Sequence, residues 1–444
     1  MTEAFTFEDL PPIEGRPELT WPGKRPLRSA TWRPSRLKES YGSANDGWMN
    51  RLYCGDNLQV MAHLLGDFRG KVDLVYIDPP FGSDANYASR IHPKGRPAYP
   101  LLFTFAERRF GDVWARGEYL QFMYERLVLI RELLSEKGSL FVHCDRCSQH
   151  LLRCLLDEVF GASVEEKGAP GLVNEIIWHH SYTPVDPDDR FVPGHDTIFW
   201  YSKTGNCYFN AVDVAEPDPG RAETGDWKVP GTVWRIDPVA VGSSLAVGYP
   251  TQKPEALIER IVLAASAPGS IVMDCFMGSG TTGAVAMRTG RRFLGADVSP
   301  ASVRTTTKRL VQVARELDSA SSGNALFTGF EVHDLPPGQE DPNSDGELDA
   351  VIADGHLVIR EFQPRNLVRR LGLSPDFFED WRHLADSIFI DWNYNGEVFR
   401  PSVADVPAGD DLVEGSYAVP ESAGAIRIRL VDVLLEAFEV DVRA

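Results

Sequence analysis

The chain has 444 residues, enough for two or three domains with sizeable cores, and its formal net charge of −19 is unusual for a nucleic-acid-binding protein, because Lys and Arg make the phosphate contacts. No apolar run approaches the ~20 residues of a membrane-spanning helix, and no secretory signal opens the chain, so we expect no membrane segment. Six cysteines without a framework pattern argue against a disulfide scaffold and predict reduced thiols in a cytoplasmic protein.

The N-terminal residues 1–45 are rich in proline and in basic residues, with Trp21 and Trp32 among them. This composition predicts an extended arm. Two interpretations stay open, since the arm could lie on a nucleic acid or could be a solvated or core-wrapping tail.

Residues 71–77 form an apolar, β-branched run that predicts a buried parallel strand, and Asp78, Pro79, Pro80 and Phe81 follow it. Two adjacent prolines fix φ, cannot continue the strand and leave carbonyls free to point into a site. The Asp78 carboxylate and the Pro79 carbonyl could accept both hydrogens of an amino group while Phe81 stacks on the ring that carries it. The segment therefore predicts a site for a flat base with an exocyclic amine; an ordinary Pro-rich turn is the alternative.

An amphipathic helix is predicted at about residues 118–135, and a core strand at about residues 139–145. Residues 143–150 contain His and Cys at a spacing that superficially suggests a metal site. A zinc site needs about four convergent ligands, and His143 and Cys144 point to opposite sides of a strand. We therefore expect no bound metal.

A second strand is predicted at residues 270–274, followed by the glycine turn 278–280 and a helix that begins near Thr281. Glycines allow the backbone to approach a ligand closely, and a helix N-terminus offers unpaired N–H groups. A further strand at residues 292–296 ends at Asp297. An acid at that place in a Rossmann-like unit can accept hydrogen bonds from ribose hydroxyls.

Residues 78–81, residues 249–255 (Tyr-Pro-Thr-Gln-Lys-Pro-Glu) and residues 274–282 together resemble the amino-methyltransferases of DNA. The order of the three motifs resembles the circularly permuted beta class, which includes the modification subunits of type III restriction systems. The resemblance extends from about residue 50 to residue 317. It implies an α/β protein whose Rossmann-like domain, with circularly permuted motif order, transfers a methyl group from S-adenosylmethionine to N6 of a flipped-out adenine in double-stranded DNA.

The same resemblance assigns roles to individual residues. It implies that the catalytic residues are Asp78, Pro79, Pro80 and Phe81. It implies that the cofactor-binding residues are Asp56, Lys253, Asp274, Phe276, Gly278, Ser279, Gly280, Thr281 and Asp297. Asp56 has a second interpretation as the N-cap of the helix that follows it.

Aspartate at position 78 argues for adenine, because the related cytosine-N4 enzymes usually carry Ser or Thr there. Phe81 departs from the commoner tyrosine and keeps the stacking face. Three alternatives stay open: cytosine-N4 methylation, methylation of RNA or of a protein amide, and a non-catalytic subunit that binds DNA or cofactor in a larger complex.

The predicted domain organisation is an arm (1–45), a methyltransferase domain (46–325) and a smaller, acidic, β-rich C-terminal domain (326–444). Within the methyltransferase domain, the basic loop 83–111 is expected to close over DNA and cofactor, and residues 174–246 are expected to read the target sequence.

The negative charge is concentrated in the C-terminal domain. Residues 331–444 hold 24 acidic and 9 basic residues, which leaves 40 acidic and 36 basic residues in 1–330. The methyltransferase part is therefore nearly neutral and can present a basic cleft to DNA. In the C-terminal domain, Asp354 and Gly355 predict the turn of a β-hairpin. Homodimerisation and the docking of a restriction or defence partner are the roles that we expect for this domain.

Overall fold

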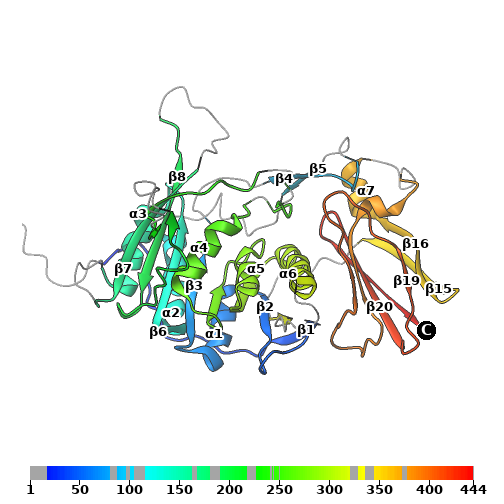
Figure 1. The fold of residues 1–444 in the computed structure, drawn as a ribbon, viewed down its shortest axis with the longest axis horizontal. Coiled ribbons are helices and arrows are strands. Elements are labelled where there is room, and N and C mark those ends of the chain that lie inside the picture. The colour runs from blue at the N-terminus through cyan, green and yellow to red at the C-terminus, as the bar shows by residue number, and fades with distance from the viewer. Residues whose placement is uncertain are drawn as a thin grey trace, which may run out of the picture.

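The computed structural model describes most of the chain, and Figure 1 shows a large sheet with helices beside a β-rich C-terminal region. The described residues are 18–80, 88–96, 101–104, 116–162, 168–180, 191–217, 227–240, 243, 245–249, 251–320, 329–335, 345–372 and 378–443. Among them, no helix combines the length and the apolar character that crossing a membrane requires.

A ten-stranded sheet forms the centre of the molecule. In sheet order its strands are β1 (Arg36–Tyr41), β14 (Phe330–Asp334), β2 (Asn50–Cys54), β13 (Arg292–Asp297), β12 (Ile271–Asp274), β3 (Val72–Ile77), β6 (Leu134–Cys144), β8 (His195–Ser202), β7 (Gly171–His179) and β11 (Val233–Arg235). The strands from β14 to β6 run parallel to one another, whereas β1 and β8 are antiparallel to their neighbours. The predicted α/β class is confirmed.

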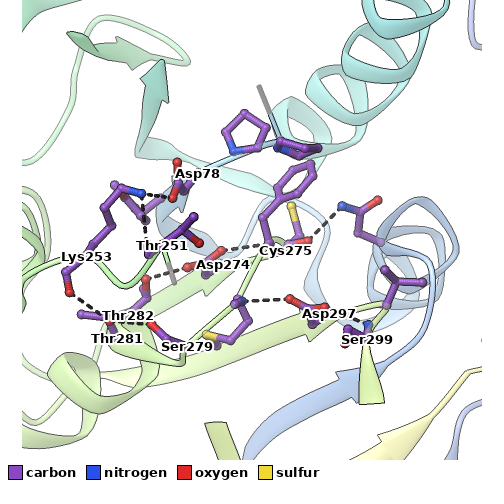
Figure 2. A pocket seen from close by; sticks show the side chains of 18 of the residues that line it. Asp78, Thr251, Lys253, Asp274, Cys275, Ser279, Thr281, Thr282, Asp297 and Ser299 are labelled. Atoms are coloured by element: carbon purple, nitrogen blue, oxygen red, sulfur yellow. Dashed lines mark hydrogen bonds and ion pairs between the residues drawn. The ribbon is translucent and has the colours of Figure 1, made fainter. Parts of the chain in front are cut away.

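The strand order explains how distant motifs meet. β12 pairs with β3 on one side and with β13 on the other, so the ends of strands that are some 200 residues apart in the chain become neighbours. The carboxyl ends of parallel strands lie at one edge of a sheet, which is where α/β proteins bind ligands. Figure 2 shows Asp78, Asp274 and Asp297, which end or follow β3, β12 and β13, around a single pocket.

In the described part of the chain, six helices cover the two faces of the sheet. They are α1 (Asn57–Phe68), α2 (Arg116–Leu133), α3 (Gln149–Phe160), α4 (Glu255–Ala265), α5 (Thr281–Arg288) and α6 (Pro300–Ala320). α2 contacts α1 and α3, and α5 contacts α4 and α6, so each face carries three helices.

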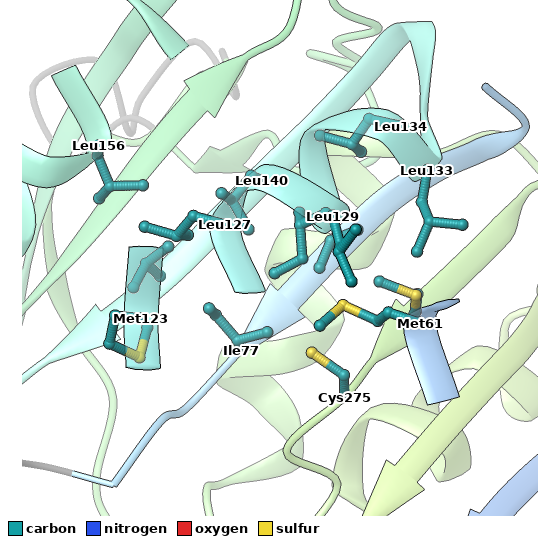
Figure 3. Close-up of a cluster of buried hydrophobic side chains, with 14 of the residues drawn as sticks. Met61, Ile77, Met123, Leu127, Leu129, Leu133, Leu134, Leu140, Leu156 and Cys275 are labelled. Carbon is teal, nitrogen blue, oxygen red and sulfur yellow. The ribbon is translucent and has the colours of Figure 1, made fainter. Parts of the chain in front are cut away.

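Successive side chains of β3 point to opposite faces of the sheet and pack into the hydrophobic core on each face. Val75 and Ile77 pack into the cluster under α1–α3, and Leu74 and Tyr76 pack into the cluster under α4–α6. Figure 3 shows the first cluster, in which Ile77 lies among Met61 of α1 and the methionine and leucines of α2. Burial on both faces holds this strand, and therefore the segment that follows it, rigidly in place.

The N-terminal segment packs on the protein from residue 18 onward. Trp21 is buried and makes an edge contact with Tyr124 of α2, at 6.1 Å between ring centroids. Lys24 forms an ion pair with Glu158 of α3 at 2.7 Å. The described part of the segment therefore wraps the core, and its last residues form the edge strand β1.

Two antiparallel sheets make up the C-terminal region, and they share one hydrophobic core. The three-stranded sheet contains β15 (Gly346–Ala353), β16 (His356–Pro364) and β19 (Ser416–Ala418); the four-stranded sheet contains β18 (Val403–Asp405), β17 (Ala385–Asp391), β20 (Ala425–Asp432) and β21 (Ala437–Arg443); α7 (Arg365–Leu371) and the 3₁₀ helix η3 (Trp381–Leu384) accompany them. The predicted hairpin is confirmed, since Ala353 pairs with His356 across Asp354 and Gly355, both at positive φ. β14, which lies inside the range 326–444, instead extends the central sheet beside β2.

Short strands complete the chain: the pair β9 (Glu216–Pro217) and β10 (Trp227–Lys228), and the hairpin β4 (Ala88–Ile91) and β5 (Leu101–Thr104). The hairpin belongs to the expected lid 83–111, of which 83–87, 97–100 and 105–111 lie outside the described residues.

The tip of this hairpin is held by the C-terminal region. The Lys94 N–H donates to the His383 carbonyl at 2.7 Å, and the His383 ring bonds the Lys94 carbonyl at 2.6 Å. The Asp386 carboxylate lies 3.8 Å from the Lys94 ammonium and 2.6 Å from that of Lys308 on α6. One buried carboxylate therefore connects the hairpin, α6 and the C-terminal sheet.

Replacing Asp386 with Asn is expected to lower the free energy of unfolding by about 3 kcal/mol, because it leaves Lys94 and Lys308 partly buried without their anion. Burial by itself raises the pKa of Asp386, but the two lysines outweigh it and lower the pKa. The stabilisation is therefore present above the ordinary carboxyl range and is lost as the pH falls through the lowered pKa. Urea unfolding followed by circular dichroism measures the change.

The matched control is Asp345→Asn, which removes exposed pairs with Arg365 and Arg369. Exposed ion pairs contribute about 0–1 kcal/mol, so this variant is expected to stay near the wild type. Equal losses in the two variants would contradict the role given to Asp386.

Candidate functional site

The Asp78 carboxylate stands at the end of β3, and both of its oxygens have partners. His143 of β6 approaches Oδ1 through Nδ1 at 2.6 Å, and Lys253 pairs with Oδ2 through its ammonium group. Burial by itself raises the pKa of Asp78, but Lys253 and His143 outweigh it and lower the pKa to about 2. Asp78 is therefore an anion at neutral pH, and its unused lone pairs remain acceptors.

A glycine turn follows β12 and begins α5. Gly280 is the N-cap residue of this helix and has φ +77°, and a Cβ there would lie 2.8 Å from the side chain of Thr306. Gly278 also has a positive φ, of +53°. Only glycine takes up this conformation without strain, which places the backbone N–H groups of the turn and of the helix N-terminus at the pocket.

Asp274, the last residue of β12, accepts two hydrogen bonds from the turn. The Thr282 hydroxyl donates to Oδ2 at 2.6 Å and the Phe276 N–H donates to Oδ1 at 2.9 Å. Burial raises the pKa of Asp274 to about 7, with the negative charges of Asp78 and Asp297 adding to the effect and the two hydrogen bonds opposing it.

Asp297, the last residue of β13, binds the backbone on both sides of the pocket floor. Its Oδ2 accepts the Gly278 N–H and its Oδ1 accepts the Ser299 N–H, both at 2.8 Å. Figure 2 shows these contacts below Asp274. The carboxylate thus fixes the glycine turn in addition to lining the cavity.

Asp56 follows β2 and is the N-cap of α1, where its side chain accepts the Leu58 N–H at 3.0 Å. It also pairs with Arg126 of α2 at 3.2 Å and lines the pocket. The N-cap interpretation is confirmed, and it does not exclude a ligand beside the same carboxylate. The guanidinium of Arg126 lies 3.4 Å from the ring centroid of Phe122 and donates to Asn57 at 2.6 Å.

One pocket brings these groups together, with about 1060 Å³ of space including its open mouth. The sequence-predicted residues that line it are Asp56, Asp78, Pro79, Pro80, Lys253, Asp274, Phe276, Gly278, Ser279, Thr281 and Asp297. Gly280 acts through its backbone geometry, and Phe81 lies outside the described residues. Within the described ranges no group of His, Cys, Asp and Glu could hold a metal ion.

The sequence does not predict roles for several residues in or beside the pocket. Phe122, Tyr76 and Tyr249 add aromatic walls, and Arg126 braces Asp56 from a buried position. Arg126 belongs to the predicted helix 118–135, where an arginine ordinarily faces solvent, so the sequence gives no sign of this contact. The sequence predicts a core strand at His143 and no bound metal, but it does not predict the contact of His143 with Asp78.

Comparison with known proteins identifies a family and several relatives of this chain. The family described as DNA methylase matches residues 72–308, more than half of the chain. The Type II methyltransferase M.EcaI of Enterobacter cloacae is 26% identical over 379 residues, covering 68% of this chain and 79% of its own. DNA adenine methyltransferase YhdJ of Escherichia coli (strain K12) is 26% identical over 253 residues, covering 54% and 76%.

Among solved structures, the PvuII DNA methyltransferase (cytosine-N4-specific) has a TM-score of 0.44 at 20% identity and covers 63% of this chain and 94% of its own. The family match spans both sides of the pocket, from the strand that leads to Asp78 to the helix after Asp297. The chain belongs to the DNA methylase family.

Proposed function

We propose that the protein methylates N6 of adenine in DNA at a specific sequence, with S-adenosylmethionine as the methyl donor. The observation that carries the proposal is the Asp78 carboxylate, which is 18% exposed, is held between His143 and Lys253, and lines a pocket that is built on a glycine turn. An anion is a stronger acceptor for an amino group than the hydroxyl of Ser or Thr. The name of the relative YhdJ supports adenine as the base.

The pocket fits S-adenosylmethionine. Asp297 would hold the ribose of the cofactor, and the glycine turn would lie against the cofactor with its backbone. Phe276 and Phe122, with ring centroids 6.2 Å apart, offer apolar walls to the adenine ring. Asp56 would accept from the adenine amine, and Asp274 would face the positively charged end. When bound, the cofactor supplies a methyl group on a cationic sulfur.

Asp78 and Pro79 would act on the target amine. Its lone pair is delocalised into the ring, and accepting both N–H hydrogens favours a pyramidal nitrogen and stabilises the positive charge that develops on it. Methylation leaves that nitrogen with one proton too many, and Asp78 is the acceptor placed to receive it first. Much of the remaining rate enhancement would come from holding the amine in line with the methyl group.

The target base has to leave the duplex to reach this pocket, because Asp78 is only 18% exposed. Phe81 would replace part of the lost stacking. For target recognition we propose the segment 174–246, where Phe191 is fully exposed and Trp227 is 66% exposed on β10 beside Lys228. Exposed aromatic and basic side chains of this kind suit contacts with bases and phosphates.

The setting of the reaction is a further part of the proposal. Type II names among the relatives support a role in restriction–modification, and a solitary methylase remains the alternative. A cytoplasmic location agrees with a DNA substrate and with six free cysteines. The acidic C-terminal region would support homodimerisation or the docking of a restriction or defence subunit.

Cofactor binding is expected to strengthen with rising pH and to be about three- to tenfold tighter at pH 8 than at pH 6. The reason is the pKa of about 7 at Asp274: the cationic end of the cofactor favours the ionised carboxylate, so binding releases a proton below that pH. Titration calorimetry in two buffers of different ionisation enthalpy measures both effects. Binding without proton release at pH 6 would show that Asp274 does not face the cation.

The proposed function is tested by methyl transfer from labelled cofactor to mixed-sequence DNA, followed by sequencing that detects modified bases. We expect the label in DNA and adenine modification confined to one short sequence. Label in RNA or protein alone would reject the proposal, and transfer to cytosine would replace it with N4 methylation.

A further inference from the structure

His143 lies between two carboxylates that come from the strands on either side of it. Its Nδ1 is 2.6 Å from Asp78 Oδ1, and its Nε2 is 3.2 Å from Asp196 Oδ2. β6 carries His143, and it pairs with β3 on one edge and with β8 on the other. The histidine is 1% exposed, so this arrangement belongs to the core of the sheet and not to its surface.

The two carboxylates favour the doubly protonated state of the ring. A neutral imidazole has one N–H, so it would direct a lone pair at one of the two carboxylates, whereas the imidazolium donates to both. Burial lowers the pKa of His143, but Asp78 and Asp196 outweigh it and raise the pKa.

The charged and titratable groups around the ring come from four elements. Asp78 follows β3, Asp196 lies on β8, and Lys253, which precedes α4 and pairs with Asp78, opposes protonation. His180 follows β7 and lies 3.3 Å from Asp196 on the far side of the network. The two carboxylates in direct contact therefore dominate.

We propose that His143 is a positioning residue for methyl transfer. Its Nδ1 fixes the Asp78 carboxylate, and Asp196 fixes the histidine through Nε2. The inference rests on the proposed function, since it assigns a role in presenting Asp78 to the target amine. Lys253 holds the other oxygen, but it sits on a flexible stem, whereas the imidazole is locked between two strands. Removing the ring would leave the lysine to draw Asp78 away from the orientation that the amine requires.

Two substitutions separate positioning from a structural role. The amide nitrogen of asparagine can occupy the place of Nδ1, and that of glutamine the place of Nε2. His143→Asn therefore keeps the donor to Asp78, and His143→Gln keeps the donor to Asp196. We expect the single-turnover rate constant to fall at least tenfold further in His143→Gln than in His143→Asn, with the dissociation constant for the cofactor unchanged.

The controls are the same two substitutions at His356, an exposed residue of the C-terminal hairpin whose ring forms a hydrogen bond with the turn carbonyl of Asp354. Both are expected to match the wild type. Equal rate constants for His143→Asn and His143→Gln would overturn the proposal.

A second readout does not depend on activity. Nuclear magnetic resonance of ¹⁵N-labelled imidazoles should show a proton on His143 Nδ1, and Asp196→Asn should lower the pKa of the ring. A His143 ring without a proton on Nδ1 would reject the positioning role, whereas a ring protonated on Nδ1 without methyl transfer to DNA would reject the proposed function alone.

Discussion

Replacing Asp78 with alanine is expected to reduce methyl transfer by about 10³-fold or more, because it removes the anion that we propose accepts the target amine and its proton. Cofactor affinity is expected to change by less than about threefold, since the turn and Asp297 are untouched. Rapid-quench single-turnover measurements with saturating cofactor and DNA give the first quantity, and calorimetry gives the second. Because the pKa of Asp78 is about 2, the wild-type rate should show no loss of this carboxylate above about pH 4.

Two further variants test whether the loss of rate is specific to the charge at position 78. Asp78→Asn keeps one acceptor oxygen without the charge and is expected to fall between wild type and alanine. Asp67→Ala removes an acid that is 75% exposed on α1 and should leave the rate unchanged. The role of Asp78 would be contradicted if the alanine variant kept more than about a tenth of the wild-type rate.

Replacing Asp297 with alanine is expected to weaken cofactor binding by about 10–100-fold, because hydrogen bonds to a charged group contribute about 1.5–3 kcal/mol. Two effects combine in this variant. The Gly278 and Ser299 N–H groups lose the carboxylate that holds the turn, and the ribose would lose the acceptor that we propose for it. Calorimetric titration with the cofactor measures the change, and transfer at saturating cofactor should recover much of the wild-type rate.

Asp297→Asn is the control variant that keeps the size and shape of the side chain and removes its charge. Its amide keeps one acceptor and turns a donor toward one of the two N–H groups, so an intermediate affinity is expected. An affinity in Asp297→Ala equal to that of the wild type would show that neither effect operates.

Much of this site follows from local sequence. The run before Asp78 and the strand, turn and helix around Gly280 each carry a pattern that physical rules interpret correctly. Their adjacency does not follow from such patterns, because β12 and β3 pair across some 200 residues. The resemblance to a permuted family supplied that long-range information.

The contacts of His143, Asp196 and Arg126 could not be predicted for the same reason. Each depends on which strands and helices become neighbours, and a histidine or arginine in an apolar element has many uses. The strand β14 was assigned to the C-terminal part because the acidic composition begins there, but pairing with β2 outweighs composition at that boundary. Phe81 lies outside the described residues, so its stacking role stays a prediction.

The chemical identity of the methylated nucleoside tests the account most directly. DNA that carries the recognised sequence is incubated with the protein and labelled S-adenosylmethionine, digested to nucleosides and separated by chromatography with mass detection. The account predicts N6-methyldeoxyadenosine, lost in Asp78→Ala and retained in Asp67→Ala. N4-methyldeoxycytidine as the product, or N6-methyldeoxyadenosine formed equally by Asp78→Ala, would contradict it.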